Sequence, residues 1–337
     1  MNHLHIFTLI KNNFTLRQFG ISILLQAENS NTHYTQQPLY IEMKKSITFY
    51  VNNKCRNIIR NMLALLSICL SAVPALSQTV VDADSVVDAD SVRSTAIVAH
   101  RGFWQTDGSA QNSLTALRKA QALGVYSSET DCWLTADNHI VQNHDGKIGG
   151  VVIRNAKYKA VKKLRLPNGE PVPQLSDMLK CVVNSASPTI LRIEIKEHDT
   201  PDRTLQCAQL VAKAVQRCGA THKVEFTSFS IDACRLLQQL FPQAMVYYLK
   251  GGMPPAEVKK LGVNGLNYHI NEIRQHPQWV AEAHKLGMRM CVWTADTPHD
   301  MIEMNALGVD MMSSNKPDLA MKVMHRIEAK DSKLSSR

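Results

Sequence analysis

The sequence predicts a (β/α)8 barrel, and three features support this fold. From residue 95 onward, short apolar strand-like segments alternate with amphipathic helical segments. Eight such pairs fall within about 230 residues, which is the number and size expected of this barrel. The competing fold, a doubly wound open sheet, calls for a glycine-rich phosphate-binding turn after its first strand. Residues 100–104 read His-Arg-Gly-Phe-Trp instead, so the barrel is favoured.

The predicted barrel strands are short and rich in apolar or β-branched residues, as buried parallel strands are. In chain order they are Ala96–His100, Tyr126–Trp133, Thr189–Lys196, Val224–Phe229, Ala244–Leu249, Gly265–His269, Arg289–Trp293 and Val309–Ser313. Residues 139–145 are expected to fold back on the second strand. Residues 146–173, rich in Gly, Lys and Pro, are expected to form an irregular insertion after it.

The predicted helices show the usual punctuation, with proline at several starts and glycine after several ends. They are Asn112–Leu123, Leu175–Val183, Asp202–Cys218, Ile231–Leu240, Pro255–Leu261, Pro277–Leu286, Pro298–Leu307 and Asp318–Ala329. We therefore expect one barrel domain over residues 95–330.

The segment before the barrel has the features of a secretory signal. A basic stretch begins at Met43, and the apolar run Met62–Leu76 follows it. The small residues Ala75 and Ser77 stand where a signal peptidase reads, just before Gln78. The run holds about 15 residues, short for a membrane span that needs about 20. We expect cleavage and export to the periplasm or the medium, without stable membrane insertion; an uncleaved membrane anchor is the alternative.

The flanking segments fit this interpretation. Residues 43–77 would form the signal peptide, and residues 1–42 an upstream extension that arises from a misassigned start codon. Residues 81–86 read Val-Asp-Ala-Asp-Ser-Val and repeat at once as residues 87–92. A duplicated segment of acidic and small residues is typical of a flexible linker, which we place at residues 78–94.

Net charge gives little support to nucleic-acid binding. The chain has 38 Lys and Arg against 29 Asp and Glu, but residues 1–77 hold seven of the former and two of the latter. The remaining residues carry 31 basic and 27 acidic side chains, a net of +4, with no block of basic residues. A small anionic substrate suits this balance.

Charged side chains gather at the predicted carboxyl ends of consecutive strands, where barrel enzymes hold their catalytic groups. Glu129 and Asp131 are two residues apart, so both side chains point to one face of their strand, and Glu194 and Lys196 share a face in the same way. Three carboxylates inside a barrel would repel one another. A hard divalent cation with oxygen ligands is the simplest way to compensate them.

Two histidines stand in equivalent places. His100 and Arg101 end the first strand, and His144 with Asp145 ends the extension after the second. Ser228, His269 and Trp293 end later strands. A single histidine or Glu-x-Asp pair is usually structural; the repetition of charged pairs at one end of consecutive strands is what favours a functional site.

These motifs, in this order, resemble the glycerophosphodiester phosphodiesterase family over residues 95–320. The family's His-Arg-Gly corresponds to residues 100–102, its Glu-x-Asp strand to residues 129–131, and its Thr-x-Asp turn and His-Asp pair to residues 135–137 and 144–145. Its Glu-x-Lys matches residues 194–196. Further matches are its Ser-Phe and Trp-Thr strand ends, at residues 228–229 and 293–294.

The resemblance implies a metal-dependent hydrolase that converts glycerophosphodiesters, small-molecule substrates, to sn-glycerol 3-phosphate and an alcohol. It implies Ca²⁺ or Mg²⁺ held by three carboxylates, two acid–base histidines, two phosphate-binding cations and an apolar wall for the glycerol carbons. The residues in these roles are Glu129, Asp131 and Glu194 for the metal, His100 and His144 for catalysis, Arg101 and Lys196 for phosphate, and Trp104, Phe229 and Trp293 for the wall.

Two departures from the family pattern stand out. Gln111 replaces the glutamate of the family's Glu-Asn-Thr, a residue that lies near Arg101, and Asn315 replaces an aspartate before the final proline. Two other functions stay open at this point. One is a related phospholipase-like lyase that stops at the cyclic phosphate; the other is a silent barrel that binds a phosphodiester without turnover.

Overall fold

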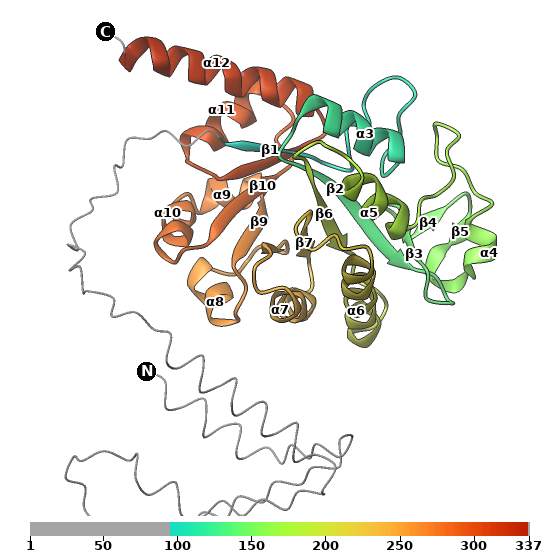
Figure 1. Ribbon diagram of the computed structural model, residues 1–337. Helices are drawn as coiled ribbons and strands as arrows, with labels where there is room; N and C mark the ends of the chain where they lie inside the picture. The colour runs from blue at the N-terminus through green and yellow to red at the C-terminus, as the bar shows by residue number, and fades with distance from the viewer. Residues whose placement is uncertain (1–94, 336–337) are drawn as a thin grey trace, which may run out of the picture. The chain divides into compact units, whose positions relative to one another are not determined.

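The computed structural model describes residues 95–335 (Figure 1). The predicted extension 1–42, signal peptide 43–77 and linker 78–94 lie outside the described residues. Within the described part, no helix is both long enough and apolar enough to cross a membrane.

The core of the domain is a closed barrel of eight parallel strands. Strand β1 pairs with β11 on one side and with β2 on the other, which closes the sheet (Figure 1). The barrel strands are β1 (Ala96–Ala99), β2 (Ser127–Leu134), β6 (Ile190–Ile195), β7 (Val224–Ser228), β8 (Val246–Tyr248), β9 (Gly265–His269), β10 (Arg289–Trp293) and β11 (Met311–Ser314). The predicted barrel is confirmed.

Helices surround the barrel and cover its outer face (Figure 1). They are α3 (Leu114–Leu123), α5 (Leu175–Val183), α6 (Pro201–Arg217), α7 (Ile231–Leu240), α8 (Pro255–Lys260), α9 (Ile270–Gln275), α10 (Gln278–Lys285), α11 (Pro298–Ala306) and α12 (Pro317–Ser335). Side-chain oxygens cap several of them: Ser113, for example, accepts a hydrogen bond from the backbone N–H of Ala116 at the start of α3.

The structure differs from the sequence prediction by more than one residue in three helices. Helix α12 runs to Ser335, beyond the predicted end at Ala329. Helix α9 was not predicted, because it follows β9 directly with no proline or glycine between them; His269 caps it by accepting from the backbone N–H of Asn271. Helix α3 starts two residues later than expected. Asn112 lies before the helix in the left-handed conformation, with φ of 60°. Its side chain donates to Asp131 of β2.

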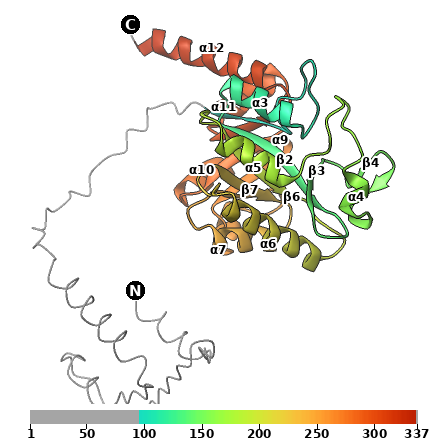
Figure 2. The same ribbon diagram turned by 45° about the vertical axis from the view of Figure 1, so that its right-hand side comes forward.

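The insertion after β2 has a small core of its own. Strand β3 (Ile140–Gln142) runs back antiparallel to β2, as predicted, and is followed by the hairpin β4 (Lys147–Ile148) and β5 (Val151–Val152), the turn η3 (Ile153–Asn155) and the short helix α4 (Tyr158–Val161). Both views show this subdomain beside β3, outside the ring of helices (Figures 1 and 2). Its buried residues include Ile153, Val161 and Leu166, and Trp133 at the end of β2 packs on them.

Alternation along β6 separates charged side chains inside the barrel from apolar side chains outside it. Ile193 and Ile195 of β6 are fully buried in the layer between strands and helices. Arg192, two residues before Glu194, is fully buried inside the barrel. It donates to Glu225 across 2.6 Å, and its guanidinium lies 4.3 Å from the centre of the Tyr247 ring. Burial of such a pair is tolerated because the partners satisfy each other.

Gly102, in the turn after β1, has no room for a side chain. A Cβ atom there would lie 2.6 Å from Ala116 Cβ and 2.9 Å from the Ala116 backbone carbon, and the residue has φ of +80°. The missing side chain lets the turn lie directly on helix α3. It also fixes the position of the two residues before it, His100 and Arg101.

We predict that Gly102→Ala destabilises the fold by more than backbone strain alone. Gly124, at the end of α3, is the matched control, because it has φ of +75° but no heavy atom within 4 Å of its added Cβ. Gly124→Ala should lower the free energy of unfolding by about 1 kcal/mol, whereas Gly102→Ala should lower it by about 1–3 kcal/mol more. Denaturant unfolding measures both; equal losses would contradict the close approach to α3.

Candidate active site

A cavity opens at the carboxyl ends of the barrel strands. Its lining includes residues from all eight barrel strands or from the loops that directly follow them, and His144 from the loop after β3. They are His100, Arg101, Glu129, His144, Glu194, Lys196, Thr227, Phe229, Leu249, Asn267, Trp293 and Ser313. Among the eight site residues predicted from sequence, seven line this cavity, and the eighth, Asp131, is bonded to Lys196 beside it.

The three predicted carboxylates converge. Glu129, Asp131 and Glu194 each offer an oxygen within 4.8 Å of the other two, and all three side chains are buried. The strand register explains this, because Asp131 of β2 lies beside Glu194 of β6. One oxygen of Glu129 accepts from the backbone N–H of Arg101 at 2.7 Å; the other, Oε1, is fully buried and has no hydrogen-bond partner.

Lys196 is the cation closest to these carboxylates. Its Nζ lies 2.8 Å from Glu194 Oε1 and 3.1 Å from Asp131 Oδ1. Burial alone would lower the pKa of Lys196, but the two carboxylates outweigh it and raise the pKa above its ordinary value. Lys196 therefore remains charged and offsets part of the acidic charge.

One positive charge does not neutralise three carboxylates. Burial, with the charges of Asp131 and Glu194, raises the pKa of Glu129 well above its ordinary value. Burial also opposes ionisation of Asp131, but Lys196 and His144 reverse this and lower its pKa. The unbonded Glu129 oxygen, the residual negative charge and the all-oxygen donor set fit a hard divalent cation such as Ca²⁺ or Mg²⁺.

The ring of His100 has a defined tautomer. Its Nδ1 lies 2.9 Å from Asn315 Oδ1, and that oxygen also accepts from Trp104 Nε1 at 3.2 Å. Asn315 Nδ2 donates to Asp296 Oδ2 at 2.7 Å, which fixes the amide orientation. Since an amide oxygen only accepts, Nδ1 of His100 carries the proton and Nε2 of the neutral ring is free to accept one.

His144 stands in a more open place. It is half-buried, and its Nδ1 lies 2.7 Å from Asp145 Oδ1. Its backbone carbonyl accepts from the indole N–H of Trp133, which ties this loop to the end of β2. Burial lowers the pKa of His144, although Asp131 acts in the opposite direction. The two histidines thus line one cavity with different hydrogen-bond partners: an amide for His100 and a carboxylate for His144.

Arg101 is held by a neutral side chain. Its Nη1 donates to Gln111 Oε1 at 2.9 Å, and its Nε is buried without a partner. The expected proximity of residue 111 to Arg101 is confirmed. Because Gln111 has no charge, it positions the guanidinium without neutralising it.

The three aromatic residues expected in the apolar wall have different places. Phe229 and Trp293 line the cavity and meet edge to face, with ring centres 5.9 Å apart. Trp104 is not part of the lining; it donates to Asn315. Of the other strand-end residues, Ser228 donates to the Ile195 carbonyl, and His269 is exposed.

The structure adds three polar residues to which the sequence analysis gave no role. Asn112 is buried at the centre of the site: its Nδ2 donates to Asp131 Oδ2, and its Oδ1 accepts from Asp131 N and Thr130 Oγ1. Asp296 orients Asn315, and Asn267 lines the cavity. The Glu-Asn-Thr motif points to position 112, but no sequence pattern marks the other two.

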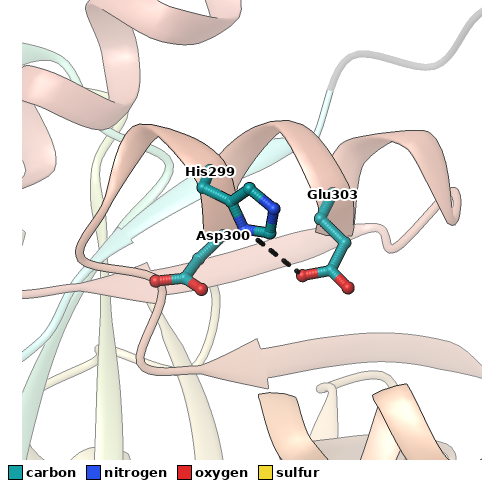
Figure 3. Close-up of side chains that lie close together, drawn as sticks. All are labelled: His299, Asp300 and Glu303. Carbon is teal, nitrogen blue, oxygen red and sulfur yellow. Dashed lines mark ion pairs between the residues drawn. The ribbon is translucent and has the colours of Figure 1, made fainter.

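A second group of potential metal ligands lies on helix α11. His299, Asp300 and Glu303 are close together on the outer surface (Figure 3). Arg274 already pairs with both carboxylates, at 2.5 Å from Asp300 and 2.6 Å from Glu303. Its guanidinium supplies the charge that a cation would bring, so we assign no metal to this cluster.

Comparison with known proteins identifies the family. The family model described as the glycerophosphoryl diester phosphodiesterase family matches residues 100–319. The chain belongs to this family. A crystal structure of a glycerophosphodiester phosphodiesterase from Parabacteroides distasonis is 40% identical, with a TM-score of 0.69, and the match covers 70% of this chain and 99% of that one.

Other relatives agree. A glycerophosphodiester phosphodiesterase of Caldanaerobacter subterraneus subsp. tengcongensis is 23% identical over 246 residues, which cover 69% of this chain and 98% of the relative. A phosphodiesterase of Oleispira antarctica, solved in complex with the product sn-glycerol-3-phosphate, shares the fold at 18% identity and a TM-score of 0.59 over 68% of this chain and 96% of that one. The resemblance seen in the motifs is confirmed, and the chain is a phosphoric diester hydrolase of the glycerophosphodiester phosphodiesterase family.

The surroundings of His100 predict a pH-dependent stability. Burial, and next the charge of Arg101, lower the pKa of His100 from 6.5 to about 4. Between pH 6.5 and about 4, therefore, the unfolded chain binds a proton at His100 and the folded protein does not. The contribution of His100 to the free energy of unfolding should fall by about 2–3 kcal/mol as the pH drops from 6.5 towards 4.

Denaturant unfolding of the metal-free protein and of His100→Gln, measured across that pH range, tests this. The stability of the wild-type protein should decrease relative to the variant as the pH falls. Parallel curves for the two proteins would mean that the imidazole ionises equally in both states and would refute the assignment.

Proposed function

We propose that this protein hydrolyses glycerophosphodiesters to sn-glycerol 3-phosphate and an alcohol, with a divalent cation, Ca²⁺ or Mg²⁺, and a pair of histidines. The observation that carries the proposal is the convergence of three carboxylates and two imidazoles on one cavity. Family membership supports the substrate class. The sn-glycerol-3-phosphate bound to the Oleispira antarctica relative supports the product.

Glu129, Asp131 and Glu194 would hold the cation. When bound, a divalent cation withdraws charge from the phosphorus and so favours attack on it. Hydrogen bonds within the chain orient these ligands. The Asn112 amide bonds to one oxygen of Asp131 and the Arg101 N–H to one oxygen of Glu129, which leaves the other oxygens for the cation.

His100 would act first as the general base. Its Nδ1 is held by Asn315, and its low pKa keeps Nε2 unprotonated at neutral pH. The hydroxyl next to the phosphorylated glycerol carbon is a nucleophile already tethered to the phosphorus, which avoids the entropic cost of bringing in a second molecule. His100 would take its proton, the O–P bond to the alcohol would break, and a cyclic phosphate would form.

His144 would be the general acid. Asp145 accepts from Nδ1 and orients the ring, and together with Asp131 it opposes the burial that lowers the pKa of His144. The protonated ring can give its Nε2 proton to the departing alcohol. Water would then open the cyclic phosphate, with the two histidines in reversed roles. Arg101 would bind the phosphate oxygens, because Gln111 leaves its charge uncompensated, and Lys196 would add to the positive potential. Trp293, with Phe229, would contact the glycerol carbons.

Metal dependence gives the first test of this function. A chelator should abolish activity, and Ca²⁺ or Mg²⁺ should restore it. Glu129→Gln should weaken cation binding, measured by calorimetry, and kcat/KM on a glycerophosphodiester together, each by at least about tenfold. Glu303→Gln, a glutamate from the second acidic group on α11, is the control and should change neither. Full activity in excess chelator would exclude the proposed site.

The histidines give the second test. His100→Ala and His144→Ala should each lower kcat by about 10²–10⁴-fold, with cation binding unchanged, while the exposed His299→Ala should have no effect. A nitrophenyl diester of glycerol, whose leaving group needs no proton, should restore the rate of His144→Ala only. Rescue of His100→Ala instead would reverse the two roles. Phosphorus NMR of the products separates the hydrolase from a lyase, for which the cyclic phosphate would be the end product.

A further inference from the structure

Asn267 has an unsatisfied side chain inside the cavity. It lies on β9, two residues before the strand ends, and is only 4% exposed. Its Oδ1 is fully buried and has no hydrogen-bond partner among residues 95–335. A buried amide oxygen without a partner costs about 1–3 kcal/mol, so its presence at the lining of a ligand cavity calls for a partner from the ligand.

The neighbours of Asn267 hold it in place but leave the amide free. Its backbone carbonyl accepts from Trp293 Nε1 at 3.0 Å, which ties β9 to the indole that lines the same cavity. The hydroxyl of Thr227, also in the lining, donates a hydrogen bond to the Tyr247 backbone carbonyl at 3.1 Å. The apolar side chains of Phe229, Trp293 and Leu249 complete this part of the lining. Asn267 is therefore a polar group in a largely apolar part of the site.

We propose that Asn267 binds the terminal hydroxyl of the glycerol group, the one that is neither phosphorylated nor the nucleophile, and so makes the site select glycerol over a simple diol. This inference rests on the proposed hydrolysis of glycerophosphodiesters. The apolar surfaces suit the glycerol carbons. A hydroxyl can donate one hydrogen bond and can also accept, so it can bond to either end of the amide.

The chemistry of the substrate explains why one hydroxyl depends on Asn267. The phosphate would be bound by the cation site and Arg101, and the neighbouring hydroxyl would be bonded to the base, His100. The terminal hydroxyl has no such partner and would be buried against apolar side chains. A site built to bond a hydroxyl rejects an analogue that lacks it, because its own polar group then stays buried and unbonded.

Two diesters with the same leaving alcohol test the inference. One contains glycerol; the other contains propane-1,2-diol phosphorylated on its primary carbon, which keeps the nucleophilic hydroxyl and lacks only the terminal one. The wild-type protein should prefer the glycerol diester by about 10- to 100-fold in kcat/KM. Asn267→Leu, of nearly equal shape, should reduce this preference to about threefold or less. Asn267→Ala, which only removes atoms, should do the same and covers a failure of the leucine variant to fold.

Thr227→Val is the matched control, since it removes a hydroxyl from the same cavity that is already bonded to a backbone carbonyl. Whatever its overall rate, it should keep the wild-type preference between the two diesters. Equal losses on both substrates in the Asn267 variants, with the preference intact, would overturn the inference while leaving the proposed function standing. A wild-type protein that prefers neither diester would overturn it as well. One that cleaves neither would refute the proposed function itself.

Discussion

Repulsion among three buried carboxylates determines which side chains surround them at the carboxyl ends of the barrel strands. Glu129, Asp131 and Glu194 are packed closely enough to share one ion, and water is largely excluded from them. Such a group is stable only if positive charge or hydrogen-bond donors surround it. Lys196, the Arg101 backbone and the Asn112 amide supply part of this compensation. The remaining deficit is the positive charge that a hard cation would supply in the proposed function.

The need to hold these donors explains local features that are unfavourable by themselves. Arg101 and Asn112 both have positive φ, a conformation that side-chain-bearing residues seldom adopt. In return, the Arg101 N–H reaches Glu129, and the Asn112 amide reaches Asp131. The two residues are also bonded to each other, through Asn112 N and the Arg101 carbonyl. Strain in the two loops is thus coupled to the placement of the acidic groups.

The sequence predicts the barrel well because its signals are local and repeated. Apolar strands, glycine after helices and paired charges at strand ends can all be recognised without knowledge of the fold. Helix α9 escapes detection because it is short and joins β9 without a break. Asp296 and Asn267 escape for a different reason, since an isolated Asp or Asn has no pattern around it. Asp296 orients Asn315, 19 residues further along the chain, and Asn267 is marked only by the cavity that it lines. Their roles exist only once the strands are side by side.

The inner face of β6, continued by the residue that follows it, carries charges of alternating sign: Arg192, Glu194 and Lys196. The opposite face carries Leu191, Ile193 and Ile195, packed under helices. A slip of one residue in the pairing of β6 would exchange these two sets, so that three charges would enter the apolar layer and three aliphatic chains would replace the partners of Glu225 and Asp131. The misaligned barrel is therefore penalised on both faces of one strand. The same ladder of charges that builds the site also ensures that the chain closes in a single alignment.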